Sequence, residues 1–214
     1  MSLVLYYGPQ NCSLVPFVAL TEAGADFEVR LVNLEKKQQM TPEFLRLNPK
    51  HRVPVLLVDE EVVTENVAIQ LWIAEQFPSA RLLPERTFDK MRAVAILAWC
   101  ASGIHPLLRR TRIPHTICDV PGTEDSTRRL AQNELFEVFG IANEMLAGRE
   151  YFFDHFTTSD THFFWCFRRA ASFEIDVSRF GHCMAHFERM QQRASVQKVL
   201  AFEKEADAQL ARPA

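Results

Sequence analysis

Cys12 is the side chain whose place in this sequence is best suited to chemistry. The apolar run Leu3–Tyr7 predicts a short strand, and Gly8 begins the turn that follows it. Ser13 is a candidate cap for a helix that ends at Gly24, so Cys12 falls between the strand and the helix. Backbone N–H groups at the start of a helix have no partner within it and favour an anion. A thiolate in that position has a lowered pKa.

Two chemical interpretations of this position remain open. Cys12 can itself be a nucleophile, or the same N–H groups can stabilise a thiolate that a ligand carries. A third interpretation involves no chemistry, because free cysteine is most often a small buried hydrophobic residue.

A second segment with chemical potential is a predicted β-hairpin and the helix that follows it. Residues 53–58 and 62–63 are apolar and flank a charged turn, which is the pattern of a hairpin. Pro54 lies near the opening of the first strand, where a strand tolerates proline. Asn66 is a candidate cap for a helix that runs to about Gln76. The start of this helix is a second place where an anion would be stabilised.

The predicted elements before Pro78 follow the order strand, helix, strand, short helix, hairpin and helix. This order is typical of a thioredoxin-like α/β unit. From Thr87 onward the apolar residues recur at helical spacing. The expected fold is therefore an α/β thioredoxin-like N-terminal domain, residues 1–80, joined to an all-α C-terminal helical domain, residues 87–214.

Three polar residues stand out in the helical half. His105 precedes Pro106 inside an otherwise helical pattern, and the proline is expected to kink or break that helix. A lone His on a helix is most often structural, and this interpretation of His105 stays open. Thr157 and Asp160 have the spacing of a capping box and predict the start of a central buried helix.

Composition argues against several classes of partner. The 214 residues include 24 Lys and Arg and 27 Asp and Glu, with no basic stripe, so we expect no nucleic-acid partner. No apolar run approaches the roughly 20 residues of a membrane span, and the pattern of a signal peptide is missing, so we expect no membrane partner. Five scattered cysteines without a CxxC pair indicate reduced thiols and a cytoplasmic protein. We expect no metal, since no cluster has convincing ligand spacing.

Three segments occur in a characteristic order over most of the first third of the chain: LYYGPQNCSLVPFVALTEAG, FLRLNPKHRVPVL and TENVAIQLWIAEQFP. Together they resemble the cytosolic glutathione transferases, and most of all the bacterial beta class. The helical part adds two local matches, Ile104-His105 and Phe156–Asp160. The resemblance implies a homodimer that binds glutathione as co-substrate and activates its thiol. The thiol would attack a small electrophilic, hydrophobic co-substrate or a disulfide.

The resemblance implies catalytic roles for Cys12, Ser13 and His105, which would surround the glutathione thiol and lower its pKa. Other classes use Ser or Tyr where this chain has Cys12, which opens a variant. Cys12 would then form a mixed disulfide with glutathione and act in thiol transfer or as a glutathione lyase. The alternative from another functional class is a non-catalytic, glutathione-binding stress or carrier protein of the same fold.

The resemblance also implies five residues that hold the tripeptide. A lysine in the polar segment 33–40 would pair with the glycyl carboxylate, and a cis peptide bond would turn backbone groups toward the cysteinyl unit. An acidic residue and its polar neighbour would hold the γ-glutamyl end. In that order these residues are Lys37, with Lys36 as second candidate, Val53 and Pro54, and Glu65 and Asn66. His51 stands where the family usually has Gly, so we expect a different loop conformation or an altered rim there.

Overall fold

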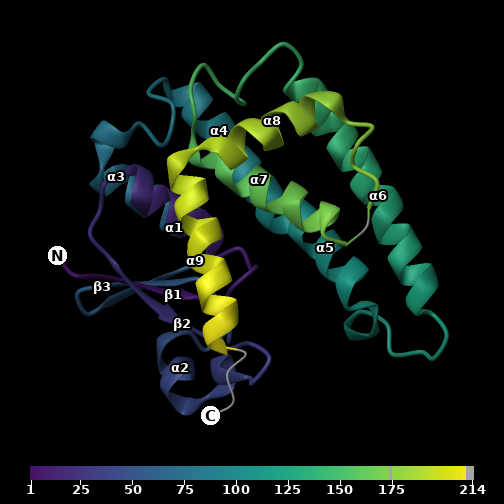
Figure 1. Ribbon diagram of the computed structural model, residues 1–214, viewed down its shortest axis with the longest axis horizontal. Helices are drawn as coiled ribbons and strands as arrows, with labels where there is room; N and C mark the ends of the chain where they lie inside the picture. Colours follow the sequence, from purple (N-terminus) through teal and green to yellow (C-terminus); the bar gives the residue numbers. More distant parts are fainter. Residues whose placement is uncertain (174, 211–214) are drawn as a thin grey trace. The chain divides into compact units, whose positions relative to one another are not determined.

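The computed structural model describes residues 1–173 and 175–210 (Figure 1). The first part of the chain has the predicted order of elements. They are β1 (Leu3–Tyr7), α1 (Leu14–Glu22), β2 (Glu28–Leu31), α2 (Pro42–Leu47), β3 (Val55–Val58), β4 (Glu61–Thr64) and α3 (Asn66–Gln76). A 3-10 turn, Gln38–Met40, precedes α2. Thr41 caps α2, because its hydroxyl oxygen accepts a hydrogen bond from Phe44 N at 3.3 Å.

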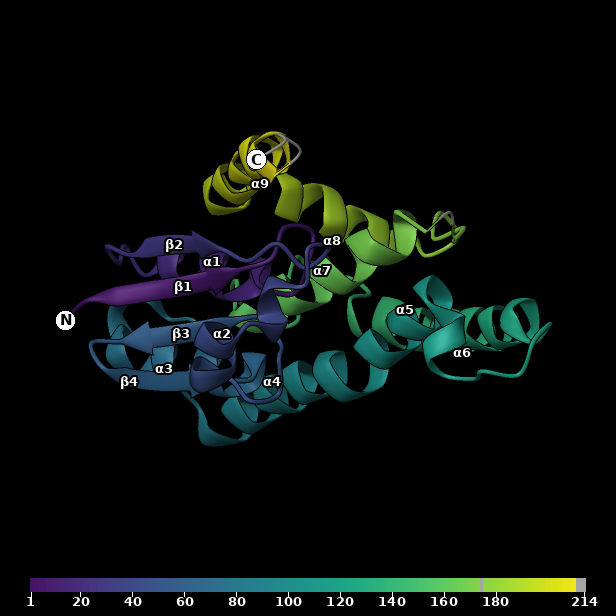
Figure 2. The ribbon, with the colours of Figure 1, turned by 90° about the horizontal axis from the view of Figure 1, so that it is seen from below.

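The strands form one mixed sheet in the order β2-β1-β3-β4 (Figure 2). β1 pairs in parallel with β2 and antiparallel with β3, and β3 and β4 form the predicted hairpin. Helices α1 and α3 pack against each other, α1 against β1 and α3 against β4. The thioredoxin-like α/β unit expected from the sequence is confirmed.

Alternation along β1 sends neighbouring side chains to opposite faces of the sheet. The ring of Tyr6 packs edge-on against Phe44 of α2, with 6.1 Å between centroids. Tyr7 is fully buried and packs against Phe17 of α1 and Phe202, with centroid separations of 5.9 and 5.4 Å. The sheet is therefore covered by aromatic side chains on both faces.

The last helix, α9 (Ala194–Leu210), belongs to this unit. The structure divides into one unit made of Met1–Leu82 and the described chain from Gln192, and a second unit, Leu83–Gln191. This differs from the expected ranges 1–80 and 87–214, which placed α9 with the other helices. The physical reason is a buried contact that sequence spacing does not show. The Tyr7 hydroxyl donates to Glu203 Oε1 of α9 at 2.8 Å, and Gln10 N donates to the same oxygen at 2.8 Å.

The regular secondary structure in the described residues of the second unit is all helical. It contains α4 (Thr87–Trp99), α5 (His105–Arg112), α6 (Glu124–Met145), α7 (Thr158–Ala171) and α8 (Gly181–Gln192). A π-helical segment, Cys100–Ile104, joins α4 to α5. Pro106 has no N–H to donate to the preceding turn, so the regular α-helical ladder fails there. The predicted interruption of this helix near Pro106 is confirmed, and it takes the form of the π-helical segment.

Residues 87–112 are, in the part of the chain that the structure describes, the one helical stretch long and apolar enough to cross a membrane by length and composition. The expectation that no apolar run approaches this length therefore does not hold by this measure. About two fifths of its most apolar window, 39%, is buried inside the unit. A helix from the core of a protein outside membranes has the same properties, so one such stretch is a weak indication.

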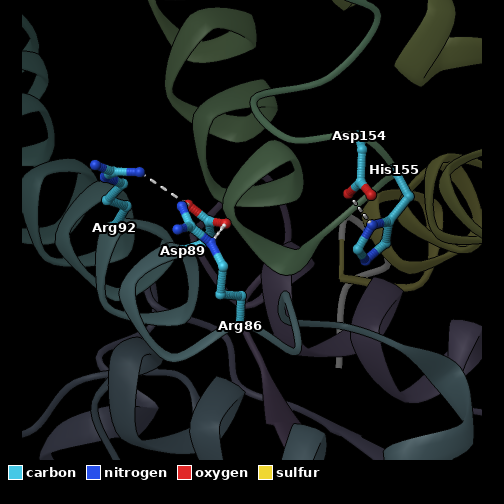
Figure 3. A network of polar contacts seen from close by, with 5 residues as sticks. All are labelled: Arg86, Asp89, Arg92, Asp154 and His155. Atoms are coloured by element: carbon cyan, nitrogen blue, oxygen red, sulfur yellow. Dashed lines mark hydrogen bonds and ion pairs between the residues drawn. The ribbon is translucent and has the colours of Figure 1, made fainter.

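The start of α4 carries a compact ion cluster (Figure 3). Asp89 lies in the first turn, and its carboxylate accepts from Arg86 at 2.6 Å and from Arg92 at 2.9 Å. The hydrogen bond from Arg86 is the main cause that lowers the pKa of Asp89 to about 2. A carboxylate in this place also complements the positive end of the helix dipole.

Helix α7 is the centre of the helical unit. Phe163, Phe164 and Phe167 are buried, and their rings contact rings of neighbouring elements, as for Phe167 with Phe139 of α6 at 5.2 Å. Another such pair is Phe164 with Phe187 of α8 at 5.3 Å. The Phe-rich sequence of α7 therefore serves core packing.

The predicted capping box at the start of α7 is confirmed. Asp160 is fully buried, and one carboxylate oxygen accepts from Thr157 N at 2.8 Å and Thr157 Oγ1 at 3.0 Å. The other oxygen accepts from Phe152 N at 3.0 Å and lies 3.1 Å from His186 Nε2 of α8. One carboxylate thus ties the helix start to the preceding loop and to a neighbouring helix.

We predict that Asp160→Ala lowers the free energy of unfolding by about 3 kcal/mol, because it leaves several buried donors without an acceptor. Urea denaturation followed by circular dichroism measures this. The matched control is Asp154→Ala, since Asp154 is exposed and its carboxylate lies 2.6 Å from the neighbouring His155 (Figure 3). The control should change stability by less than about 1 kcal/mol. Equal effects of the two substitutions would contradict a special role of the buried carboxylate.

Candidate active site

Three of the predicted site residues meet in the α/β unit. Cys12 lies in the turn before α1 and is 7% exposed. Its Sγ is 3.6 Å from the carbonyl oxygen of Val53, in the geometry of an S–H donor. Its own carbonyl oxygen accepts from Asn66 Nδ2 at 3.0 Å. The turn before α1, the segment before β3 and the start of α3 therefore converge on one cysteine.

The expectation of a lowered thiol pKa at Cys12 is wrong for this structure. Burial is the largest cause and raises the pKa of Cys12 to about 12, and the negative charge of Glu65 raises it further. Hydrogen bonds from the backbone N–H and the Asn66 side chain oppose this with smaller effects. Desolvation of a charge in an apolar interior outweighs the attraction of a helix start. At neutral pH Cys12 is therefore a protonated thiol.

Ser13 has a different local role from the one expected. It does not cap α1 with its side chain, because its backbone is already helical, with φ −62° and ψ −19°. Its hydroxyl oxygen instead accepts from Gly8 N at 3.2 Å and is buried. Ser13 thus closes the turn that holds Cys12.

The peptide bond between Val53 and Pro54 is cis, as the resemblance implied. Both residues are buried, and Val53 belongs to the apolar cluster on the α2 face of the sheet. His51, where the family usually has Gly, has a φ of 48°, in the left-handed region that favours glycine. The chain keeps a glycine-like backbone there with a side chain in place, and His51 Nδ1 lies 2.7 Å from Arg52 Nη1.

The start of α3 corrects one detail of the sequence analysis. Glu65, with φ 74°, occupies the cap position, and Asn66 is the first residue of the helix. Neither residue caps α3 through its side chain. Asn66 Oδ1 is buried and has no hydrogen-bond partner among the described residues. A buried acceptor of this kind is satisfied when a donor arrives from outside.

Sequence reasoning missed Lys50, although it lies in one of the quoted segments. Lys50 Nζ is 2.5 Å from Glu65 Oε1 and 2.9 Å from Thr64 Oγ1. The spacing of the residues carries no signal for this pair, because the hairpin between them brings the two together.

The remaining predicted site residues are Lys37, with Lys36 as second candidate, and His105. Lys36 and Lys37 are exposed in the turn after β2, and Lys37 has a φ of 56°. The assignment of Lys37, or Lys36, to a carboxylate therefore stays a prediction. His105 belongs to the helical unit, and its predicted approach to a thiol also stays a prediction.

His105 has a distinctive environment within its own unit. Its ring packs edge-on against Trp165, with 4.6 Å between centroids. His162, one turn before Trp165 on α7, is fully buried, and neither of its ring nitrogens has a hydrogen-bond partner in the described parts of the chain. Burial, with a smaller contribution from His105, lowers the pKa of His162 to about 3. His162 is therefore a neutral neighbour of His105 and Trp165. The sequence pattern of α7, which is rich in Phe, did not single it out.

Two further findings limit the chemistry. All five cysteines, each within the described residues, are free thiols. Across residues 1–173 and 175–210, no group of three His, Cys, Asp or Glu side chains is arranged to hold a metal ion.

The arrangement in the α/β unit offers a neutral S–H donor, an unsatisfied amide acceptor, a carboxylate and a helix start. These groups suit a small zwitterionic or peptide-like ligand.

We predict that Cys12 of the native protein resists alkylation by iodoacetamide at pH 7.5. A thiol with its pKa near 12 has about a thousandfold less thiolate than one with its pKa near 9, and Cys12 is also buried. Cys118, which is more exposed, should be labelled first. Peptide mapping by mass spectrometry gives the order, with urea-unfolded protein as the control in which all five react. Labelling of Cys12 before Cys118 would show an activated thiolate instead.

Comparison with known proteins identifies the family. The model described as "Glutathione S-transferase, N-terminal domain" matches residues 1–75. Glutathione S-transferase GstA from Escherichia coli O157:H7 is 29% identical over 207 residues, which cover 93% of this chain and 98% of that protein.

Two solved structures are similar over nearly the whole chain. A sphingomonad glutathione S-transferase complexed with glutathione is 31% identical, with a TM-score of 0.83 and coverage of 94% of this chain and 98% of that one. A bacterial beta class glutathione S-transferase from Sphingomonas chungbukensis is also 31% identical, with a TM-score of 0.82 and the same coverage. The chain belongs to the glutathione S-transferase family.

Proposed function

We propose that this protein is a glutathione transferase, most like the bacterial beta class. It binds glutathione in the α/β unit and activates its thiol for attack on a small electrophilic, hydrophobic co-substrate. The observation that carries this proposal is the convergence of Cys12, the cis Val53–Pro54 bond and Asn66 at one buried point. The solved relatives include one complexed with glutathione, which supports the same ligand here.

In the proposed binding mode, different groups of the α/β unit hold the three parts of glutathione. The backbone of Val53 pairs with the cysteinyl unit, as in the addition of a β-strand. Glu65 faces the γ-glutamyl ammonium, while free N–H groups at the start of α3 donate to its carboxylate. The orphaned Asn66 Oδ1 accepts a donor from the ligand. Lys37, or Lys36, pairs with the glycyl carboxylate.

The protonation state of Cys12 supports one of the two chemical roles that the sequence left open. An unperturbed thiol with a pKa near 8.5 is only a few per cent ionised at neutral pH, so glutathione needs stabilisation of its thiolate. A neutral Cys12 can donate its S–H to that thiolate, with His105 as a second donor. Thiol transfer or lyase chemistry needs Cys12 itself as a thiolate, which burial opposes. We therefore favour conjugation with Cys12 as a hydrogen-bond donor.

The test compares the parent with Cys12→Ala and Cys12→Ser. Glutathione binding is measured by calorimetry, conjugation with an aryl halide, and disulfide chemistry with a mixed disulfide. We expect all three proteins to bind glutathione within about threefold of each other. Cys12→Ala should lower kcat for conjugation by about tenfold or more, the loss of one hydrogen bond to a charged group, and raise the pKa in its pH profile. Cys12→Ser, which keeps a donor, should retain most of the rate.

Three outcomes would change the proposal. A parent that binds no glutathione would refute it. Loss of the disulfide reaction alone in both variants would make Cys12 a redox nucleophile. Binding without turnover of any electrophile in the parent would favour the carrier protein of the same fold.

We propose further that the protein is a cytoplasmic homodimer without a nucleic-acid or membrane partner. The free thiols suit a reducing compartment. Phe88 and Met91 are one turn apart on α4 and are 73% and 52% exposed. We take this exposed apolar pair as the candidate contact with a second copy of the chain.

We expect sedimentation equilibrium to give about twice the chain mass of 24.6 kDa. The double variant Phe88→Ser, Met91→Ser should sediment as a monomer, because the apolar surface that drives association is lost. Ile117→Ser, which removes another exposed apolar side chain, is the control and should leave the mass unchanged. A parent that sediments as a monomer would contradict the dimer.

A further inference from the structure

Lys50 lies in a hydrogen-bonded turn that brings its side chain to Glu65. The turn 48–52 follows α2, and Asn48 at its start is buried. Asn48 Nδ2 donates to the Arg52 carbonyl oxygen at 2.8 Å, and Asn48 Oδ1 accepts from Lys50 N at 3.2 Å. His51 N donates to the Asn48 carbonyl oxygen at 2.9 Å. The backbone that carries Lys50 is therefore fixed by a buried side chain.

The ammonium of Lys50 has two acceptors. It is 2.5 Å from Glu65 Oε1 and 2.9 Å from the hydroxyl of Thr64, the last residue of β4. The side chains of Lys50 and Glu65 are 49% and 66% exposed. An exposed pair of this kind contributes little to stability and can exchange with solvent or with a ligand.

We propose that Lys50 is a specificity-determining residue of the ligand site. Its ammonium partly neutralises the one carboxylate that the proposed function assigns to the ligand's own ammonium. The inference rests on that proposed function and goes beyond it. A carboxylate that already faces one cation attracts a second cation less, and the two cations repel each other.

The consequence is a reduced preference for ligands with an ammonium at this position. Glutathione carries the γ-glutamyl ammonium, whereas its desamino analogue, glutaryl-cysteinyl-glycine, lacks only that group. The ratio of their dissociation constants isolates the interaction at Glu65, because the remaining parts of the two ligands are the same. Removing Lys50 should therefore increase the ratio in favour of glutathione.

The experiment measures both ligands by calorimetry on the full chain. In Lys50→Met the ratio of the dissociation constant of the desamino analogue to that of glutathione should rise about two- to fivefold. The rise should shrink in 0.5 M salt, because exposed charges are screened. Lys198→Met is the matched control, since Lys198 is an exposed lysine of the same unit on α9. It should leave the ratio unchanged.

Glu65→Gln distinguishes the possible failures. This variant should lower the ratio, and Lys50→Met should raise the ratio less in its presence than in the parent, because only the direct repulsion between the two cations remains. If Glu65→Gln lowers the ratio and Lys50→Met leaves it unchanged or lowers it, the inference about Lys50 is wrong while the proposed function stands. If the parent binds no glutathione, or if Glu65→Gln leaves the ratio unchanged, the assignment of Glu65 fails, and the inference fails with it.

Discussion

Burial of the Cys12 thiol against the Val53 carbonyl oxygen is the constraint on which the chemistry of the α/β unit depends. It joins the turn after β1 to the segment before β3, and the bond from Asn66 adds the start of α3. These three segments follow different elements, so their meeting depends on the whole sheet. These segments enclose the thiol, and its burial is the main cause of its raised pKa.

The charged groups at the rim of this cluster, unlike the buried thiol, are exposed to solvent. Glu65 and Lys50 are largely exposed, and water screens their charges. Their interaction is too weak to hold the fold but is of the size that tunes the binding of a charged ligand. The site thus combines a buried thiol with a solvent-exposed carboxylate. Desolvation sets the protonation of the thiol. The charge of Lys50 sets how strongly the Glu65 carboxylate attracts a cationic ligand.

The helical unit shows how differently two buried polar residues can be accommodated. Asp160 accepts hydrogen bonds from the capping box and the preceding loop and lies 3.1 Å from His186 Nε2 of α8, so its carboxylate has partners inside the core. His162, two residues further along α7, has no such partners in the described chain and is kept neutral by burial. The first arrangement organises the fold, and the second leaves an unsatisfied polar group beside the ring of Trp165, which His105 also contacts.

Local patterns in the sequence determined most elements of this protein. The strand Leu3–Tyr7, the capped helix Pro42–Leu47, the hairpin and the capping box at Thr157 all depend on residues close together in the chain. The resemblance to a known family added the cis bond at Pro54. These features are readable because turns, caps and alternation act over a few residues.

The tertiary structure alone decided the properties that depend on distant neighbours. Burial reversed the expected pKa shift of Cys12, since desolvation is set by packing and not by position at a helix start. The Tyr7 hydroxyl donates a hydrogen bond to Glu203 of α9, so the last helix belongs to the first unit. The hairpin brought Lys50 to Glu65. Each of these contacts joins residues far apart in sequence, and their energies come from burial and charge proximity, which have no signature in local spacing.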